Sequence, residues 1–398
     1  MPFYRSLGRV PPKRHTQFRD DDGHLFAEEL VGQEGFEGGS SLLYHRHRPT
    51  AVTSVEVVDE EPRVLVPPSP LRPRHLRTSQ LKTGGDAVLS RHVLLGNDDL
   101  TVCFVAADEP SPLHRRSFGD DLFFVQSGHA VLESVFGALA VGPGDYVVVP
   151  AAVTHRWVPG DGETLRALVI EAAGHVGAPA RYLSARGQFL EHSPYCERDL
   201  RGPDRLLEGE GSDVEVLVRH RAGLTRFSYQ RHPFDVVGWD GCAWPYAFNV
   251  ADFEPITGRV HQPPPVHETF AGGNFAVASF VPRKLDYHPG AIPAPYNHSN
   301  VDSDELLFYV DGTFTSRKGS NIEVGSISMH PSGFPHGPQP GAVEASIGVA
   351  ETTETAVMID TFAPLRLGPA AADCDDETYP LSWVEQPPKA DLAGGQAS

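Results

Sequence analysis

The sequence has no long hydrophobic run. No apolar stretch approaches the roughly 20 residues that a membrane-spanning helix needs, and the opening residues, MPFYRSLGRVPPKRH, have no apolar core of the kind found in a secretory signal. We therefore expect a cytoplasmic protein without a membrane partner. With 398 residues, of which 40% are hydrophobic, the chain is long enough to bury a large core.

Positive charge is scarce. Lys and Arg together number 33 against 52 Asp and Glu, which gives a formal net charge of −19. Because binding to a phosphate backbone needs a cationic surface, this excess of acid argues against nucleic acid as the main partner. A small-molecule partner remains open.

Closely spaced cysteines are missing. The four cysteines lie far apart in the sequence and form no C-x-x-C pair: Cys103, Cys196, Cys242 and Cys374. This spacing matches neither a zinc finger nor a dense disulfide framework, so we expect reduced cysteines.

Helical periodicity is weak nearly everywhere, whereas Gly (39) and Pro (36) are abundant. Strand-like alternation or short apolar runs occur instead at residues 130–136, 145–150, 306–310, 313–317 and 322–329. The sequence therefore predicts an all-β protein of β-sandwich or barrel type.

Two parts of the chain share one pattern. In each, an acid follows a His by seven residues and a Gly follows the acid by seven: His114, Asp121 and Gly128 in the first copy, and His298, Glu305 and Gly312 in the second. Each copy also has a downstream block, G-x5-P-x-(G/A)-x2-H, over residues 144–155 and 325–336. The shared pattern indicates two copies of one β-barrel unit about 180 residues apart.

This pattern resembles the two motifs of the cupin superfamily, G-x5-H-x-H-x3,4-E-x6-G and G-x5-P-x-G-x2-H. The resemblance implies a bicupin, with two β-sandwich or jelly-roll barrels and few helices. We expect an N-terminal β-rich domain over residues 1–255, containing a degenerate barrel at about residues 90–175, and a C-terminal barrel over residues 256–398 with the metal site. In the second copy, Asn300 stands where the second His of the first motif belongs.

The second copy supplies the ligand types of a metal site. Two imidazoles and one carboxylate form the facial triad associated with non-haem Fe(II), so His298, Glu305 and His336 are the predicted ligands. Asp304 is the rival carboxylate, but Glu305 keeps the motif spacing, and Asp304 would point to the other face of a strand. The alternatives are a polar turn before a strand, and Mn in place of Fe.

The first copy is a poorer candidate. His114, Asp121 and His155 supply ligand types, but Arg116 occupies the place of the second His. A guanidinium beside a metal ion is electrostatically unfavourable, so we expect a structural barrel without a metal.

Four longer segments are similar to the homogentisate 1,2-dioxygenase family: FAEELVGQEGFEGGSSLLYHRHRPT (26–50), HPFDVVGWDGCAWPYAFNVADF (232–253), RVHQPPPVHETF (259–270) and SISMHPSGFPHGPQPGA (326–342). The order matches over nearly the whole chain. The resemblance implies an Fe(II) site at the three ligands chosen above by spacing, and a homo-oligomer, either a trimer or a hexamer.

The resemblance also implies further site residues. His261 corresponds to the histidine that acts on the substrate's ring hydroxyl, and an imidazole is a suitable base near neutral pH; His267 is its rival. His330 corresponds to a residue that contacts substrate or oxygen. Tyr296 corresponds to a tyrosine just before the first ligand.

Two positions bear on the substrate. A family lysine corresponds to Arg317 or Lys318, and we take Arg317 as the substrate-binding residue. A substrate-contacting tyrosine of the family is replaced here by Phe314, which cannot form a hydrogen bond. A missing polar contact can change substrate preference by orders of magnitude, so the exact aromatic substrate stays open.

The expected function is that of an Fe(II)-dependent extradiol-type dioxygenase that cleaves an aromatic ring. Its partners would be dioxygen and a small aromatic substrate, either homogentisate, converted to maleylacetoacetate in tyrosine catabolism, or a related hydroquinone or gentisate-like compound. The alternatives are a non-catalytic bicupin that serves in binding or structure, and a cupin isomerase or decarboxylase with another metal.

Overall fold

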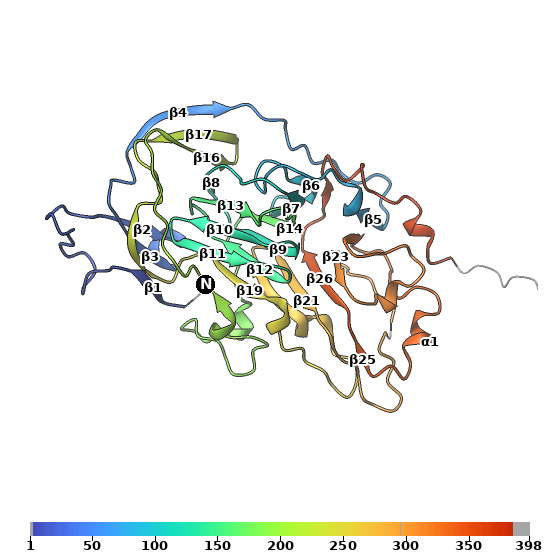
Figure 1. Cartoon of the computed structure of the whole chain (residues 1–398). Coiled ribbons are helices and arrows are strands. Elements are labelled where there is room, and N and C mark those ends of the chain that lie inside the picture. Colours follow the sequence, from blue (N-terminus) through green and yellow to red (C-terminus); the bar gives the residue numbers. More distant parts are fainter. Residues whose placement is uncertain (1–2, 295, 385–398) are drawn as a thin grey trace, which may run out of the picture.

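The computed structural model describes residues 3–294 and 296–384 and consists mainly of β-strands (Figure 1). The described residues contain one short α-helix, α1 (Ala342–Ser346), and eight 3₁₀ turns: η1 (Glu34–Phe36), η2 (Thr78–Gln80), η3 (Ala180–Tyr182), η4 (Glu197–Asp199), η5 (Val250–Asp252), η6 (Pro264–His267), η7 (Thr315–Arg317) and η8 (Tyr379–Leu381). The predicted all-β fold with few helices is confirmed. All four cysteines are free, as expected.

In the described part of the chain, no helix combines the length and the apolar character that crossing a membrane requires.

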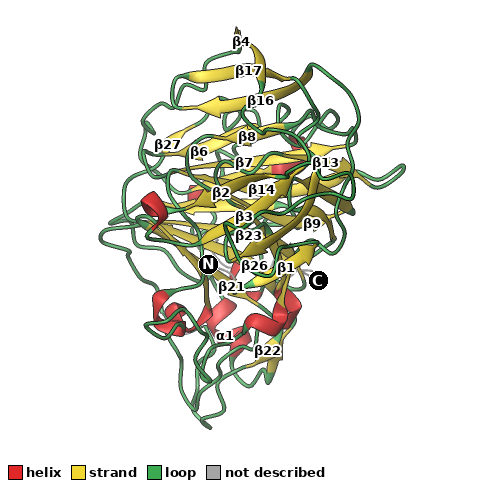
Figure 2. Cartoon of the chain, turned by 90° about the vertical axis from the view of Figure 1, so that its left-hand side faces the viewer, coloured by secondary structure: helices red, strands yellow, loops and turns green. Residues whose placement is uncertain are grey.

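The first barrel is built from a seven-stranded and an eight-stranded sheet. The seven-stranded sheet has the order β11 (Gly137–Val141), β10 (Ala130–Ser134), β13 (His155–Pro159), β8 (His114–Arg116), β16 (Val214–His220), β17 (Gly223–Tyr229) and β4 (Val52–Val58). Figure 2 shows β4 at the edge of this sheet, with β17 and β16 next to it.

The eight-stranded sheet has the order β15 (Leu200–Arg201), β19 (Tyr246–Asn249), β12 (Asp145–Val149), β9 (Asp121–Ser127), β14 (Leu165–Ala172), β7 (Leu100–Ala107), β6 (His92–Gly96) and β27 (Arg366–Leu367). Phe123 of this sheet packs on Trp157 of the other, with ring centroids 4.4 Å apart, inside the main hydrophobic core.

The second barrel is based on a six-stranded sheet of order β20 (Glu268–Gly272), β21 (Phe275–Phe280), β26 (Thr355–Thr361), β23 (Asp304–Asp311), β24 (Ser326–His330) and β5 (Arg74–Arg77). β22 (Arg283–Lys284) and β25 (Glu351–Thr352) form a separate two-stranded sheet. A separate four-stranded sheet near the N-terminus has the order β1 (Arg5–Gly8), β18 (Val236–Gly241), β3 (Ser40–His45) and β2 (Ala27–Gly32).

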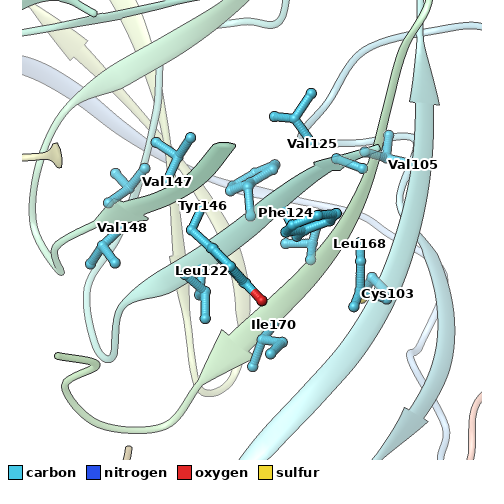
Figure 3. Packing of buried hydrophobic residues seen from close by; sticks show 14 of the residues in the cluster. Cys103, Val105, Leu122, Phe124, Val125, Tyr146, Val147, Val148, Leu168 and Ile170 are labelled. Carbon is cyan, nitrogen blue, oxygen red and sulfur yellow. The ribbon is translucent and has the colours of Figure 1, made fainter. Parts of the chain in front are cut away.

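The two barrels share one hydrophobic core. Phe308 of β23 lies 6.2 Å from Phe104 and 6.3 Å from Phe124, measured between ring centroids. Figure 3 shows the buried side chains of β7, β9, β12 and β14, among them Phe124 and Tyr146. The Tyr146 hydroxyl lies 2.8 Å from the Ser279 hydroxyl of β21, so a polar contact accompanies the apolar packing between the barrels.

Strands are exchanged between the two halves of the chain. β5, from the N-terminal half, pairs antiparallel with β24 of the second barrel, and β27, from the C-terminal half, pairs with β6 of the first. These two strands cross the predicted division at residue 255 in both directions. The division itself stays a prediction.

The glycine that closes each first motif has the same role in both copies. Gly128 has φ +80° and Gly312 has φ +91°, a region that L side chains rarely adopt. A Cβ would also collide with the carbonyl oxygen of Thr164 or of Thr353, respectively. The motif therefore needs glycine where the chain turns closely past a neighbouring segment.

Part of the predicted strand pattern is wrong. Residues 313–317 were expected to be a strand, but 315–317 form the turn η7. Phe314 packs on Tyr309, and Arg317 turns back to donate to the Tyr309 hydroxyl, so these two side chains approach the same residue at the three-residue spacing of a helical turn. The strand expected over 322–329 is observed at Ser326–His330.

Candidate metal centre and substrate cavity

The three predicted ligands meet at one end of the second barrel. Glu305 lies on β23, His298 precedes this strand, and His336 follows β24. The two histidines are joined by reciprocal backbone hydrogen bonds: the N–H of His298 donates to the carbonyl of His336 at 2.7 Å, and the N–H of His336 donates back at 2.8 Å. This bridge brings two residues from distant loops to the strand that carries the carboxylate.

The ligand atoms of the three side chains lie within 4.8 Å of one another. Nε2 of His298 is 3.4 Å from Oε2 of Glu305, and Nε2 of His336 is 3.3 Å from Oε1. The structure thus brings together the three residues that the motif spacing selected.

The hydrogen bonding of His336 provides a test of whether a metal fits. Its Nδ1 donates to the carbonyl of Phe334 at 3.0 Å, so the neutral ring has a lone pair on Nε2. That nitrogen is buried and has no hydrogen-bond partner in the described residues. A lone pair that faces a carboxylate is repulsive unless a cation lies between them. The arrangement therefore fits a metal ion, and two imidazoles with one carboxylate suit iron or manganese.

Glu305 is held as a carboxylate. Burial raises its pKa, but the hydrogen bonds from the imidazoles of His298 and His330 outweigh burial and hold the pKa well below its usual range. Asn300 adds a weak contact, with its amide nitrogen 3.4 Å from Oε2. The Glu305 carboxylate, a candidate metal ligand, therefore stays ionised at low pH.

Asp304, the rival carboxylate, has a different task. One of its oxygens accepts the backbone N–H of Ser332 and the other that of Leu365, each at 2.7 Å. Both oxygens are therefore occupied in fixing loops, and Glu305 is the acid that lies with the two histidines.

His330 lies directly behind the ligands. Its Nδ1 is 3.2 Å from Oε1 of Glu305, its Nε2 is 3.1 Å from the Tyr379 hydroxyl, and its ring stacks on His336 at 4.1 Å. Burial lowers its pKa to about 3. The side chain is fully buried, and the prediction that it contacts substrate or oxygen stays a prediction.

The first copy does not form such a cluster. Asp121 is bound by the guanidinium groups of Arg116, at 2.6 Å, and Arg91, at 3.0 Å. His114 and His155 remain as a buried edge-to-face pair with ring centroids 5.5 Å apart. Two arginines thus form ion pairs with the carboxylate that would bind a metal, and the structural role of this barrel stays a prediction.

A cavity of about 230 Å³ opens beside the metal ligands. Its lining includes His298 and Glu305 together with three other predicted site residues: His261, Tyr296 and Arg317. Nε2 of His261 is 3.0 Å from the Tyr296 hydroxyl. Burial lowers the pKa of His261, which favours the neutral form that can accept a proton.

The rival residues lie elsewhere. His267 is buried in η6 against Phe280, with ring centroids 4.9 Å apart, and burial lowers its pKa to about 3. Lys318 is exposed, whereas Arg317 is buried in the cavity wall, donating to Tyr309 and to the carbonyl of Gly337. The geometry favours His261 over His267, and Arg317 over Lys318.

Some residues that line the cavity belong to no sequence motif. Arg283 lines the cavity, and in the described part of the chain no carboxylate forms an ion pair with it within 4.0 Å. Asp286 lies 3.9 Å from Nδ1 of His261. Arg283 reaches the site from the short strand β22 and Asp286 from the residues just after it, and neither segment carries a spaced motif, so only the fold reveals them.

Comparison with known proteins shows the family. Residues 101–250 match the family described as "Homogentisate 1,2-dioxygenase N-terminal". A protein of Saccharolobus solfataricus, described as "Putative dioxygenase", is 39% identical over 387 residues, which cover 96% of this chain and 99% of that protein. The chain belongs to the homogentisate dioxygenase family.

Other members of the homogentisate dioxygenase family are more distant. The homogentisate 1,2-dioxygenase of Rhodopseudomonas palustris is 28% identical over 281 residues, which cover 67% of this chain and 61% of that protein. The present chain therefore spans about three fifths of the length of that relative.

Among solved structures, one match is hazelnut (Corylus avellana) vicilin, at 11% identity and a TM-score of 0.28, covering 87% of this chain and 85% of vicilin. Another is the E. coli protein YlbA, at 9% identity and a TM-score of 0.35, covering 76% of this chain and 94% of YlbA.

Proposed function

We propose that this protein is an Fe(II)-dependent dioxygenase that cleaves the ring of homogentisate, or of a closely related hydroquinone or gentisate-like aromatic. The observation that carries the proposal is the convergence of two imidazoles and one carboxylate on the wall of a cavity. Membership of the homogentisate dioxygenase family supports the same reaction. For homogentisate, both atoms of dioxygen would enter the product, maleylacetoacetate.

Fe(II) held by His298, Glu305 and His336 would supply the electron transfer between the aromatic ring and dioxygen. Three protein ligands would leave coordination positions for substrate and dioxygen. The chain's own residues have to bind the ring, orient it and remove its proton.

Two arginines support a substrate with a carboxylate. Arg317 and Arg283 both line the cavity beside Glu305. A guanidinium binds a carboxylate through paired hydrogen bonds, which fixes orientation as well as charge. Phe314 offers no hydrogen bond, so we assign recognition of the side chain of the substrate to the arginines.

His261 is the proposed base for the ring hydroxyl. It lies in the cavity wall, and Tyr296 fixes its ring through the contact at Nε2. Asp286, near Nδ1, would stabilise the imidazolium that forms when the proton is taken up.

Oxygen consumption tests the proposal. The protein is loaded with Fe(II) without air and assayed in an oxygen electrode with homogentisate, gentisate and hydroquinone. We expect uptake with at least one of them, and preference for the two acids over hydroquinone because the arginines need a carboxylate partner. No uptake from protein that retains iron would contradict the oxygenase assignment and favour an isomerase or decarboxylase.

The metal site has a matched control in the first barrel. His336→Ala should lose most of its iron, measured by mass spectrometry of protein purified without chelator, together with oxygen uptake. His155→Ala removes the corresponding histidine of the arginine-filled barrel and should keep both. If His336→Ala keeps full iron and activity, the ligand assignment is wrong. Absence of metal from the unsubstituted protein would favour a non-catalytic bicupin.

A further inference from the structure

A tyrosine near the C-terminus reaches the candidate metal site through one intermediate side chain. Tyr379 lies in η8, is 1% exposed, and places its hydroxyl 3.1 Å from Nε2 of His330. We propose that Tyr379 is a positioning residue that sets the proton arrangement and orientation of His330, and through it those of the ligands Glu305 and His336.

The donors and acceptors along Glu305, His330 and Tyr379 allow only one placement of the hydrogens. The carboxylate of Glu305 can only accept, so Nδ1 of His330, 3.2 Å away, carries the hydrogen. A neutral ring then has a lone pair on Nε2, and the Tyr379 hydroxyl is the donor to it. Because His330 is fully buried, water does not compete for either nitrogen.

His330 transmits this constraint to two ligands at once. The hydrogen bond from Nδ1 orients the carboxylate of Glu305. The same ring lies nearly parallel to His336, with 13° between the planes and 4.1 Å between the centroids. A rotation of His330 would therefore disturb both ligands.

Tyr379 is itself held firmly. Its ring packs on Trp383 at 5.1 Å and on His75 at 5.6 Å. Trp383 donates to the carbonyl of Gly337, the residue after the ligand His336. Asp376, three residues before Tyr379, forms an ion pair with Arg77 of β5.

The proposal rests on the metal site of the proposed function but not on the reaction. Partners behind metal ligands are typically worth about 10- to 100-fold in metal affinity. The test therefore measures binding of Co(II), a spectroscopic substitute for Fe(II), to the full chain without substrate or oxygen. A failure of the oxygenase assignment leaves this measurement unaffected.

The first variant is Tyr379→Phe, which keeps the ring and removes the hydroxyl. We expect Co(II) to bind about 10- to 100-fold more weakly, with a changed visible absorption spectrum. Tyr146→Phe is the control, because its buried hydroxyl, bound to Ser279 between the barrels, is also lost without touching the site. Affinity and spectrum should be unchanged in the control. Equal behaviour of the two variants would overturn the proposal.

A double substitution separates positioning from a general structural effect. If Tyr379 acts through His330, Tyr379→Phe should have little further effect on Co(II) affinity in a His330→Gln background. An effect of the same size in both backgrounds would contradict action through His330.

A measurement on the unsubstituted chain covers the case in which a variant does not fold. NMR of the protein labelled with ¹⁵N-histidine should find His330 in the form with hydrogen on Nδ1. Hydrogen on Nε2 would overturn the proposal.

Discussion

Asp304 and Glu305 are neighbours in the chain and have opposite tasks, because successive side chains of a strand point to opposite faces. Glu305 faces the two ligand histidines, while Asp304 accepts two backbone N–H groups from loops behind the strand. Which of two adjacent acids binds the metal is thus decided by the strand that carries them.

The base of the proposed reaction can be tested at the residue scale. His261→Ala should retain iron and lower turnover by about 10²- to 10⁴-fold, the usual contribution of a general base. Since burial lowers the pKa of His261, the unsubstituted enzyme should lose activity only below the usual histidine range, as the imidazole becomes charged. Arg283 nearby favours the neutral form, and Asp286 opposes it.

His267→Ala is the control for this substitution. His267 lies a few residues further along, but packs on Phe280 and is outside the cavity lining. It should lose stability and keep turnover. Loss of turnover in His267→Ala, but not in His261→Ala, would reverse the assignment.

His45, a buried histidine of β3, should make the free energy of unfolding depend on pH. Burial alone would lower the pKa of His45, but hydrogen bonds with Asp235, at 2.6 Å, and Glu29, at 2.9 Å, outweigh it and raise the pKa to about 9. The raised pKa means that this contribution is complete below about pH 6.5, the unfolded value, and is lost as pH rises through about 9.

The expected loss in the free energy of unfolding is about 3 kcal/mol across this range. Chemical denaturation at pH 6, 8 and 9.5 would measure it for the unsubstituted protein and for His45→Gln. The difference in the free energy of unfolding between the two proteins should narrow as pH rises. A difference that stays constant would show that His45 is not protonated in the folded protein.

At the scale of elements, the sequence predicted what is local. The short apolar runs at residues 145–150 and 306–310 predict buried strands, and these runs are observed in β12 and β23. The candidate ligands His298, Glu305 and His336 could be selected from the sequence because the motif fixes their spacing. The turn at 315–317 was not predicted, because Phe314 and Arg317 both contact Tyr309. The alternating pattern of residues 313–317 does not reveal these contacts.

The parts that could not be predicted depend on contacts between distant segments. β5 belongs to the second sheet only because it pairs with β24, and nothing in Arg74–Arg77 specifies that partner. Tyr379 reaches His330 from a segment 49 residues further along the chain. Arg283 approaches the ligands through a short ladder of β22 with β25.

At the scale of the whole molecule, the two barrels show two ways to satisfy a buried carboxylate. In the first, Arg91 and Arg116 bind Asp121 and complete a permanent ion network. In the second, the imidazoles around Glu305 leave a place that a metal ion fits. The buried acid of one barrel is therefore neutralised by arginines of the chain itself, and that of the other lies among imidazoles that fit a metal ion.

Assembly into a homo-oligomer, trimer or hexamer, stays a prediction of the family resemblance. Light scattering at micromolar concentration should give a mass that is a multiple of the 43.2 kDa chain. A stable single-chain mass under these conditions would contradict it.

The exchange of β5 has a consequence for synthesis on the ribosome. His75 of β5 and Ser326 of β24 form a hydrogen bond across 251 residues of sequence. The first barrel can begin to fold while the rest of the chain is still being translated, but β5 has to wait, unpaired, until nearly the whole protein has emerged. Such late pairing slows folding and leaves an open strand edge to be guarded against aggregation. A nascent chain stalled before residue 326 should therefore be a preferred client of chaperones.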